Sequence, residues 1–295
     1  MMALLKRNGG EGAVCHSGAE DPELIHVDCV SHIYPDGSLG IHNLCFKVRE
    51  REIVAVCGGN GSGKSTLLEH LNGLLVPSDG CVFVFGKRLD ARTKKDLWKD
   101  VGIVFQRAED QLFAPTVLDD VMFGPINMGM TIPEAMAVAL EALEAVGAKE
   151  LVNRMPNYLS GGQKRLVSMA GVLAMKPKIM ALDEPTSDLD PYHAEIIENI
   201  IVELRNNHGI SIVIATHDLD FAAQIADRIC IVKGGSIIAE GTPAEIFYNS
   251  ELLSEAGLKK PKIVQIYDEF CISRGLERRS RPVNLQELSR CFADA

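Results

Sequence analysis

A glycine-rich segment at residues 58–66, GGNGSGKST, has the residue types and spacing that bind phosphate. Its glycines let successive backbone N–H groups converge on phosphate oxygens, at the start of a predicted helix whose dipole favours an anion. Lys64 is expected to reach the β- and γ-phosphates of a nucleotide, and the Ser65 hydroxyl to bind Mg²⁺. A chance glycine turn is the alternative, but the predicted strand before the segment and helix after it favour nucleotide binding. The expected binding residues are Gly58, Gly59, Asn60, Gly61, Ser62, Gly63, Lys64, Ser65 and Thr66.

Two adjacent carboxylates end the apolar run IMALDEP at residues 179–185. Asp183 is expected at the C-terminal end of a buried strand, where α/β sheets bind ligands, and would hold Mg²⁺ there. Glu184 is placed to take a proton from an attacking water, as a general base does. A plain strand end with a polar turn is the alternative, and the phosphate-binding segment upstream disfavours it.

A second glycine-containing segment, LSGGQKR at residues 159–165, precedes an apolar stretch with helical spacing. It also has the composition of an anion site at a helix N-terminus. One nucleotide already has its phosphates enclosed by residues 58–66, so a second set of N–H donors needs another role. The economical explanation is a dimer in which this segment of one subunit closes over the ATP held by the other.

The elements that must position these segments alternate between strands and helices. Short continuous apolar runs at residues 178–184 and 211–218 are typical of buried parallel strands. A helix is predicted between them, with Pro191 at its start and Gly209 after its end. Apolar residues with helical spacing dominate residues 114 to about 165, which indicates a helical insertion. The pattern predicts an α/β fold, and a hairpin is expected to turn at Gly234–Gly235.

Composition narrows the class of protein further. The chain has 295 residues and a formal net charge of −10, so a nucleic-acid partner is not expected. Eight cysteines show no C-x-x-C pair and no zinc-site spacing, which favours reduced, buried thiols of the cytosol. No apolar run approaches the ~18 residues of a membrane span, and residues 1–23 have the composition of a flexible tail.

Five motifs, GGNGSGKST, Gln106, LSGGQKR, LDEPTSDLD and ATHD, occur in the order and rough spacing of the ATP-binding cassette (ABC) ATPases. Residues 24–246 resemble that family. The resemblance implies a P-loop NTPase (RecA-like) core with an antiparallel β subdomain and an inserted helical subdomain at about 114–165. It also implies ATP and Mg²⁺ as cofactors, ATP hydrolysis, and the sandwich dimer as the active form.

The resemblance assigns catalytic and metal-binding roles by motif. Gln106 looks like the residue that touches Mg²⁺ and links the ATP site to the membrane partner, so the expected metal ligands are Ser65, Gln106 and Asp183. His217 looks like the histidine near the γ-phosphate. The expected catalytic set is Glu184, His217 and Gln106.

Further residues match binding positions of the family. Ser160, Gly161, Gly162 and Gln163 look like the groups that bind the phosphates of the opposite subunit. Asp190 resembles the acid that couples the two sites. Tyr34 lies where the family often stacks an aromatic ring on adenine, and a tyrosine flanking a turn is its alternative.

Two stretches, residues 101–125 and 170–185, resemble the ATPases of energy-coupling-factor importers, especially the CbiO-type cobalt subfamily. Residues 247–295 resemble the short C-terminal extension of that group, which helps to hold two ATPase subunits together; a generic surface helix is the alternative. The implied function is ATP hydrolysis in an import complex for cobalt or another transition metal. The implied location is peripheral, on the cytoplasmic face of the cell membrane.

The implied partners are a transmembrane subunit, a substrate-binding membrane subunit and a second ATPase, which is either a copy of this chain or a related one. An ABC importer for a vitamin or an amino acid is the main alternative. A soluble ABC ATPase in DNA repair or translation is disfavoured by the single cassette and the acidic balance. A non-enzymatic ATP-binding regulator is disfavoured because Lys64, Glu184 and His217 are all present.

Overall fold

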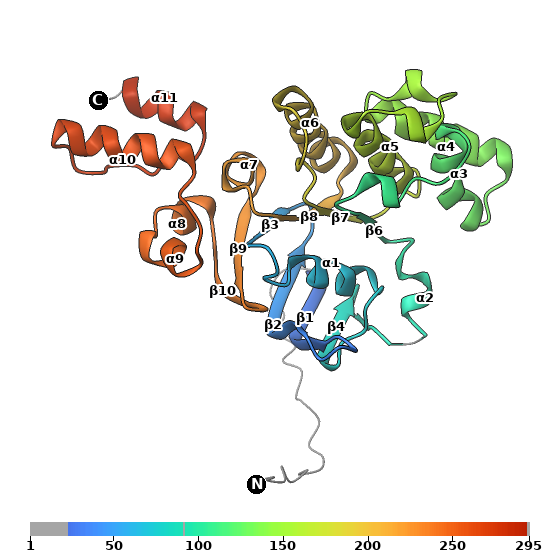
Figure 1. Ribbon diagram of the computed structural model, residues 1–295, viewed down its shortest axis with the longest axis horizontal. Coiled ribbons are helices and arrows are strands. Elements are labelled where there is room, and N and C mark those ends of the chain that lie inside the picture. Colours follow the sequence, from blue (N-terminus) through green and yellow to red (C-terminus); the bar gives the residue numbers. More distant parts are fainter. Residues whose placement is uncertain (1–22, 91, 294–295) are drawn as a thin grey trace, which may run out of the picture.

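The computed structural model describes residues 23–90 and 92–293, which form two sheets with helices around the larger one (Figure 1). The smaller sheet is antiparallel, with the strand order β2-β1-β4-β5. Its strands are β1 Glu23–Ile33, β2 Leu39–Arg49, β4 Asp79–Val84 and β5 Lys87–Arg88. Glu23 therefore begins a strand, and the rest of the tail expected at residues 1–23 lies outside the described residues.

The larger sheet has the order β10-β9-β3-β8-β7-β6, and all neighbouring pairs are parallel except β10 with β9. Its strands are β3 Ile53–Cys57, β6 Val101–Val104, β7 Ile179–Asp183, β8 Ser211–Thr216, β9 Arg228–Lys233 and β10 Ser236–Gly241. Every residue of β3, β7 and β8 is buried, as expected for parallel strands covered on both faces. The α/β class predicted from the sequence is confirmed.

Helices cover both faces of the larger sheet (Figure 1). One face packs on α1 and the antiparallel sheet through side chains such as Val54, Val56 and Leu67. The other face packs on α5 and α6 through Met180, Leu182 and Ile212. The helices are α1 Lys64–Asn72, α2 Lys94–Leu97, α3 Val117–Asn127, α4 Ile132–Ala145, α5 Gly161–Leu173, α6 Pro191–His208 and α7 Leu219–Ile225.

Between β6 and β7, the chain forms a helical region of α3 and α4 that packs on α5. Gly102 on β6 lets α5 approach the sheet closely, because a Cβ there would lie 2.2 Å from Cγ1 of Val172. The helix α5 runs to Leu173 and so belongs to both the helical region and the sheet. The boundary placed near residue 165 stays a prediction.

Two local predictions are confirmed. The helix expected between Pro191 and Gly209 is α6, and Gly209 ends it in the left-handed conformation with a φ of 67°. The hairpin expected at Gly234–Gly235 joins β9 to β10.

The C-terminal residues form four helices beside β9 (Figure 1): α8 Pro243–Phe247, α9 Ser250–Glu255, α10 Lys262–Arg274 and α11 Leu285–Ala293. Phe247 and Val264 are fully buried in a cluster that includes Ile229 and Ile231 of β9. The Tyr248 hydroxyl donates to the Pro282 carbonyl at 2.9 Å. Within the described ranges, no helix has the length and apolar composition needed to cross a membrane.

One expectation about the cysteines is wrong. Cys57, Cys81, Cys230 and Cys271 are buried as expected, but Cys29 and Cys45 are exposed on the antiparallel sheet. At Cys29, a shift in the pairing of β1 with β2 interrupts the regular alternation of inward and outward side chains.

Candidate nucleotide-binding site

The phosphate-binding segment connects β3 to α1. Gly61 and Gly63 have φ angles of 73° and 106°, a backbone region that L side chains rarely adopt. A Cβ on Gly63 would lie 2.6 Å from the Gly40 carbonyl, and one on Gly58 would lie 2.4 Å from the Val232 carbonyl. Gly61 and Gly63 are therefore required by the turn and Gly58 and Gly63 by the close approach of neighbouring backbone, whereas Gly59 has open space around it.

Lys64 occupies the centre of this turn. Its side chain is buried, and its Nζ donates to the carbonyls of Gly58 at 2.9 Å and Gly59 at 3.2 Å. The same Nζ lies 3.6 Å from Oε1 of Glu184. The ammonium group is thus held between the loop and the Glu184 carboxylate that follows β7.

Asp183 ends β7 and is buried beside Ser65. Burial raises the pKa of the Asp183 carboxyl, and a hydrogen bond with Ser65 opposes this shift. Its Oδ1 has no hydrogen-bond partner among the described residues. Mg²⁺ prefers carboxylate and hydroxyl oxygens, so an unpartnered carboxylate oxygen next to a serine hydroxyl fits the predicted metal.

Glu184 has a strained backbone, with a φ of 46°, although its side chain is buried. Its Oε1 lies 2.9 Å from Nδ1 of His217, and its Oε2 accepts from the Thr216 hydroxyl at 3.2 Å. Non-glycine residues in this backbone region cost free energy and cluster at functional sites. The strain places the Glu184 carboxylate between Lys64 and His217 instead of letting it extend into solvent.

These groups line a cleft of about 530 Å³ between the phosphate-binding segment and the carboxyl ends of β7 and β8. The structure brings together most of the residues predicted for the nucleotide, metal and catalysis. They are Tyr34, Asn60, Gly61, Ser62, Gly63, Lys64, Ser65, Thr66, Gln106, Asp183, Glu184 and His217. Sequence reasoning missed four further lining residues: Leu39 and Gly40 lie outside the motifs, and Ser187 and Asp188 lie within LDEPTSDLD but were given no nucleotide-binding role.

Tyr34 lies at the edge of this cleft. Its hydroxyl is 2.9 Å from Oγ1 of Thr66, and its ring packs edge-on against His32 with ring centroids 4.8 Å apart. A Cβ on Gly40 would meet the Tyr34 ring at 2.9 Å, so the glycine gives the ring its space. The position is consistent with a base-stacking role, which stays a prediction.

The second glycine-containing segment lies elsewhere. Ser160, Gly161, Gly162 and Gln163 do not belong to the lining of the nucleotide cleft. Ser160 caps α5: its hydroxyl accepts from the Gln163 backbone at 3.3 Å, and its own N–H donates to the Gln163 side chain at 3.1 Å. This reciprocal pair is a capping box, so the two polar side chains are satisfied within α5.

Asp190 also has a local partner. It is the N-cap of α6, where its carboxylate accepts from the His193 N–H at 3.1 Å and lies 2.5 Å from His193 Nδ1. The His193 ring packs beneath Gly162, where a Cβ would be only 2.5 Å from it. The structure thus joins Asp190 to the LSGGQ segment through His193 and does not bring it into the nucleotide cleft.

Arg165 is a functional candidate that sequence reasoning missed. It is buried in α5, and its guanidinium donates to the carbonyls of Phe105 at 2.6 Å and Gln106 at 2.5 Å. Burial lowers its pKa, an effect opposed by the nearby Asp183 carboxylate. Arg165 stands in the LSGGQKR segment, and its place in an apolar helix was the available signal. It connects the segment of Gln106 to the helix that begins at Ser160.

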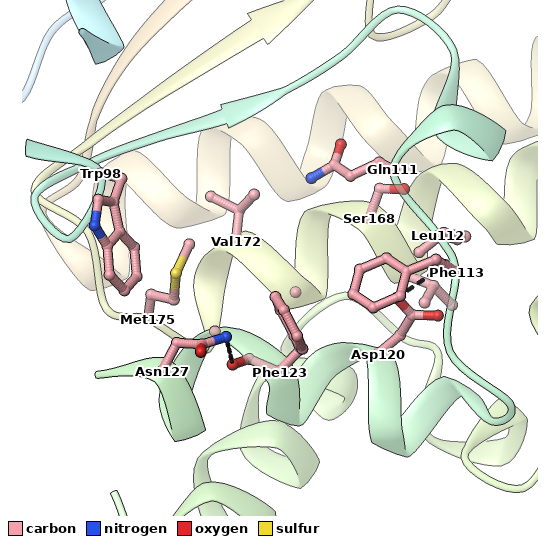
Figure 2. A pocket seen from close by; sticks show the side chains of 13 residues that line it. Trp98, Gln111, Leu112, Phe113, Asp120, Phe123, Asn127, Ser168, Val172 and Met175 are labelled. Carbon is pink, nitrogen blue, oxygen red and sulfur yellow. Dashed lines mark hydrogen bonds between the residues drawn. The ribbon is translucent and has the colours of Figure 1, made fainter. Parts of the chain in front are cut away.

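A second cleft, of about 550 Å³, lies between α3, α5 and residues 111–113 (Figure 2). Its lining is mainly apolar and includes Phe113 and Phe123, whose rings meet edge to face at 4.8 Å. These side chains are 66% and 50% exposed, unusually high for phenylalanine. We call this cleft the apolar groove.

The apolar groove connects to the nucleotide cleft through the segment that contains Gln106. The Gln111 side chain lines the groove, accepts from the Phe105 N–H and donates to the Ile103 carbonyl, both at 3.3 Å. Asp120 holds the other end of the segment by accepting from the Ala114 N–H at 2.9 Å. One short segment therefore borders both clefts.

The known proteins most relevant to this site are ABC ATPases. The family model described as "ABC transporter" matches residues 41–187. The energy-coupling factor transporter ATP-binding protein EcfA of Methanothermobacter thermautotrophicus is 46% identical over 250 residues, covering 84% of this chain and 80% of the relative. EcfA of Methanosphaera stadtmanae is 45% identical over 239 residues, covering 80% and 86%.

Two solved structures add to this. CbiO1 from Clostridium perfringens, described as part of the ABC transporter complex cbiONQ, has a TM-score of 0.72 at 36% identity and covers 84% of this chain and 100% of its own. A dimeric post-hydrolysis state of the ATP-binding cassette MJ0796, bound to ADP and Pi, has a TM-score of 0.67 at 30% identity and covers 74% and 98%.

The chain belongs to the family of ABC transporter ATP-binding proteins. It is an ATPase with the P-loop NTPase fold, as the resemblance implies. Within the family, two of these relatives are named as energy-coupling factor ATP-binding proteins and one of the structures is CbiO1, which confirms the subgroup predicted from the sequence.

Proposed function

We propose that this ATPase powers an energy-coupling factor importer from the cytoplasmic face of the cell membrane. The observation that supports the proposal best is that Glu184 contacts both Lys64 and His217 in one cleft. A cation that can bind phosphate thus lies beside a carboxylate that can act as a general base. The relatives that match at 45–46% identity are named as ATP-binding proteins of such transporters.

Hydrolysis is assigned to the residues of the nucleotide cleft. Phosphate oxygens replace the carbonyls of Gly58 and Gly59 as acceptors for Lys64. Glu184 accepts a proton as a water oxygen bonds to the γ-phosphorus and the bond from that phosphorus to the β-phosphate bridging oxygen breaks, releasing ADP. His217 orients the Glu184 carboxylate through the 2.9 Å contact.

Ser65, Asp183 and Gln106 would hold Mg²⁺. When bound, the ion offsets the negative charge of the phosphate oxygens. The support in this chain is the buried Asp183 oxygen without a hydrogen-bond partner in the described part, next to a serine hydroxyl.

We further propose that two ATPase subunits close over two ATP molecules. In each, Ser160, Gly161, Gly162 and Gln163 contact the γ-phosphate held by the opposite subunit. Two observations favour this arrangement: the segment lies outside its own cleft, and its helix N-terminus is exposed. The second subunit is a copy of this chain or a related ATPase, and residues 247–295 help to hold the pair together.

The apolar groove is the proposed docking site for a short helix of the transmembrane subunit. Its exposed phenylalanines offer an apolar surface, and Gln111 connects that surface to the segment of Gln106. Movement of this segment on ATP binding would therefore reach the docked helix. The proposed complex also contains a membrane subunit that binds the substrate.

The proposed cargo is cobalt or another transition metal, supported by the likeness to CbiO1. A vitamin or amino acid is the alternative cargo. Uptake assays with labelled Co²⁺ and Ni²⁺ in cells with and without this gene distinguish them, because a vitamin importer leaves metal uptake unchanged.

The docking proposal is tested by Phe123→Asp in cells that also produce the membrane partners. A carboxylate in the apolar groove should prevent docking, so the protein should move from the membrane fraction to the supernatant while retaining ATP binding. Ile132→Asp is the matched control, because Ile132 is 65% exposed at the start of α4 and does not line the groove. Retention of the Phe123 variant in the membrane fraction would contradict docking at this surface.

A further inference from the structure

The exposed cysteines of the antiparallel sheet meet at an irregularity in strand pairing. Val27 pairs with Phe46 and Val30 pairs with Leu44, so both Asp28 and Cys29 lie opposite Cys45. An arrangement in which two residues of one strand lie opposite a single residue of its neighbour is a β-bulge. A bulge changes the direction in which side chains point and is common beside functional sites. Cys29 has a φ of 49°, a conformation that favours glycine over a side chain.

The bulge decides which face of the sheet Cys29 occupies. In a regular strand, alternate residues share a face, so Cys29 would join Ile25 and Val27 in the core. Instead, Cys29 is exposed on the same side as Cys45. Asp28 is half-buried beside them.

Gly80 on the neighbouring strand β4 accommodates the bulge. A Cβ at this position would lie 2.4 Å from the Cys29 carbonyl and 2.7 Å from the Asp28 carbonyl. Gly80 also has a φ of 83°. Residues of three strands therefore combine to present two thiols and a carboxylate together.

The spacing of the three ligand atoms suits one metal ion. One ligand atom each from Asp28, Cys29 and Cys45 lies within 4.8 Å of the others. The two Sγ atoms are 3.5 Å apart. Two sulfur ligands at about 2.3 Å from a tetrahedral ion are separated by about 3.8 Å, so binding requires almost no movement of the chain.

We propose that Asp28, Cys29 and Cys45 form a surface site for a divalent transition metal of the zinc type, such as Zn²⁺ or Co²⁺. Two thiolates and one carboxylate oxygen supply three ligands, and water completes the tetrahedron. The site lies outside the nucleotide cleft and does not depend on the function proposed above.

Hydrogen bonds with Cys45 and then Asp28 raise the pKa of the Cys29 thiol to about 12, so this thiol keeps its proton while the site is empty. Each thiol that becomes a ligand releases its proton to solvent, so metal binding at this site should strengthen as the pH rises. The Cys29 N–H already points at Cys45 Sγ, 3.4 Å away, and would stabilise the thiolate.

Titration of the reduced, nucleotide-free full chain with Co²⁺ tests the proposal. Thiolate ligation gives a sulfur-to-cobalt charge-transfer band and the visible d–d bands of a tetrahedral site, neither of which arises from oxygen ligands alone. We expect saturation at one ion per chain and displacement of Co²⁺ by Zn²⁺. Asp28→Asn should weaken affinity by at least about tenfold, the loss that follows removal even of groups that only support a ligand.

Three variants identify the ligands. Cys29→Ser combined with Cys45→Ser should abolish the bands, whereas Cys291→Ser on α11 and Cys15→Ser, which lies outside the described residues, should leave them unchanged. Absence of the bands in the reduced wild type, or their persistence in the double variant, overturns the proposal. The proposal is also overturned if Cys29 and Cys45 bind no metal in the reduced state and only form a disulfide in air, as detected by mass spectrometry.

Discussion

The two glycine-containing segments of this chain have different surroundings although both begin helices. The segment before α1 encloses a buried lysine and faces two buried carboxylates. The second segment exposes Ser160 and Gly161 at the start of α5, and its Ser160 and Gln163 side chains hydrogen-bond to each other's backbone. The first lines a cleft that also contains the residues expected to bind and hydrolyse ATP, whereas Ser160, Gly161, Gly162 and Gln163 are not among the described residues that line this cleft.

Because their surroundings differ, two glycine-rich segments of similar composition can have different functions. The first segment stabilises bound phosphate through a charge held in a low-dielectric interior, where electrostatic interactions are strong. The second offers backbone N–H donors at an exposed helix N-terminus, which would gain comparable strength once another surface excludes water from it. The closed dimer proposed above would supply that surface, and variants of each segment can separate the two roles.

The largest expected effect comes from Glu184→Gln. The amide keeps the size of the side chain but cannot accept the proton of the attacking water, so phosphate release should fall on the order of 10²–10⁴-fold. ATP should still bind, and the variant should accumulate as a closed dimer with ATP between Lys64 of one chain and Ser160 of the other. Light scattering after size-exclusion chromatography, with and without MgATP, measures this.

The wild type under turnover is the control for this experiment, because hydrolysis reopens its dimer. If the C-terminal helices keep the subunits together in all states, a distance probe between Ser160 and Lys64 across the interface replaces the size measurement. Normal ATP turnover by the Glu184 variant would show that another group is the general base.

Lys64→Ala should act one step earlier, on nucleotide binding. The variant loses the buried cation of the phosphate-binding segment, and hydrogen bonds to charged groups contribute about 1.5–3 kcal/mol each. Affinity for a fluorescent ATP analogue should therefore fall at least about tenfold. Lys87→Ala, on the exposed strand β5, should bind like the wild type. Unchanged affinity of the Lys64 variant would refute the phosphate-binding role of the segment.

Gly161→Asp should affect only the second segment. A Cβ on Gly161 meets no described atom within 4 Å, and a carboxylate in the first turn of α5 interacts favourably with the helix dipole. The subunit should therefore fold and bind ATP normally, but the carboxylate would repel the γ-phosphate of the opposite subunit. We expect loss of ATP-dependent dimerisation in the Glu184→Gln background.

Gly162→Asp is a less specific version of this experiment, because its Cβ would collide with the His193 ring. Gly161→Ala is the matched control, since it adds the Cβ without the charge. Normal dimerisation of the Gly161→Asp variant would place the segment away from the partner's phosphates.

Local spacing in the sequence was enough to predict the phosphate-binding segment, the strand that ends at Asp183 and the boundaries of α6. These features depend on residues close together in the chain, such as the glycines at 58–63 or the N-cap Asp190. The same spacing could not assign Arg165, because its partners are backbone carbonyls about 60 residues away. The pairing of Ser160 with Gln163, by contrast, follows the S-x-x-Q spacing of a capping box and can be read from the sequence.

The cysteines show the other limit of sequence reasoning. The cysteine spacing favours buried thiols, and the absence of a C-x-x-C pair gives no sign of a metal site. The bulge at Asp28 and Cys29 instead turns Cys29 outward and brings it beside Cys45, which is the basis of the metal site proposed above. A one-residue change of register can be recognised only when the pairing with the neighbouring strand and the position of Gly80 are known.

The last expected effect is a pH dependence of stability that arises from α1, the helix that continues the first segment, and has no counterpart in α5. His70 lies on α1, fully buried, with Nδ1 2.7 Å from the Thr66 carbonyl and Nε2 without a hydrogen-bond partner among the described residues. Burial lowers its pKa from 6.5 to about 4, an effect that the nearby His32 reinforces. By contrast, α5 contains no histidine or carboxylate.

Because the fold holds His70 neutral, the unfolded chain binds more protons than the native chain between pH 6.5 and about pH 4. The stability that His70 contributes is therefore fully present above pH 6.5 and decreases as the pH falls towards 4, by about 2 kcal/mol at pH 5. Burial raises the pKa of the nearby Glu69, which shifts stability in the opposite direction, so a variant must isolate the histidine. In His70→Asn the amide can still donate to Thr66 but does not titrate. Urea unfolding at pH 7.5 and pH 5 should show a smaller pH-dependent loss in this variant than in the wild type, and equal losses would mean that His70 is not held neutral.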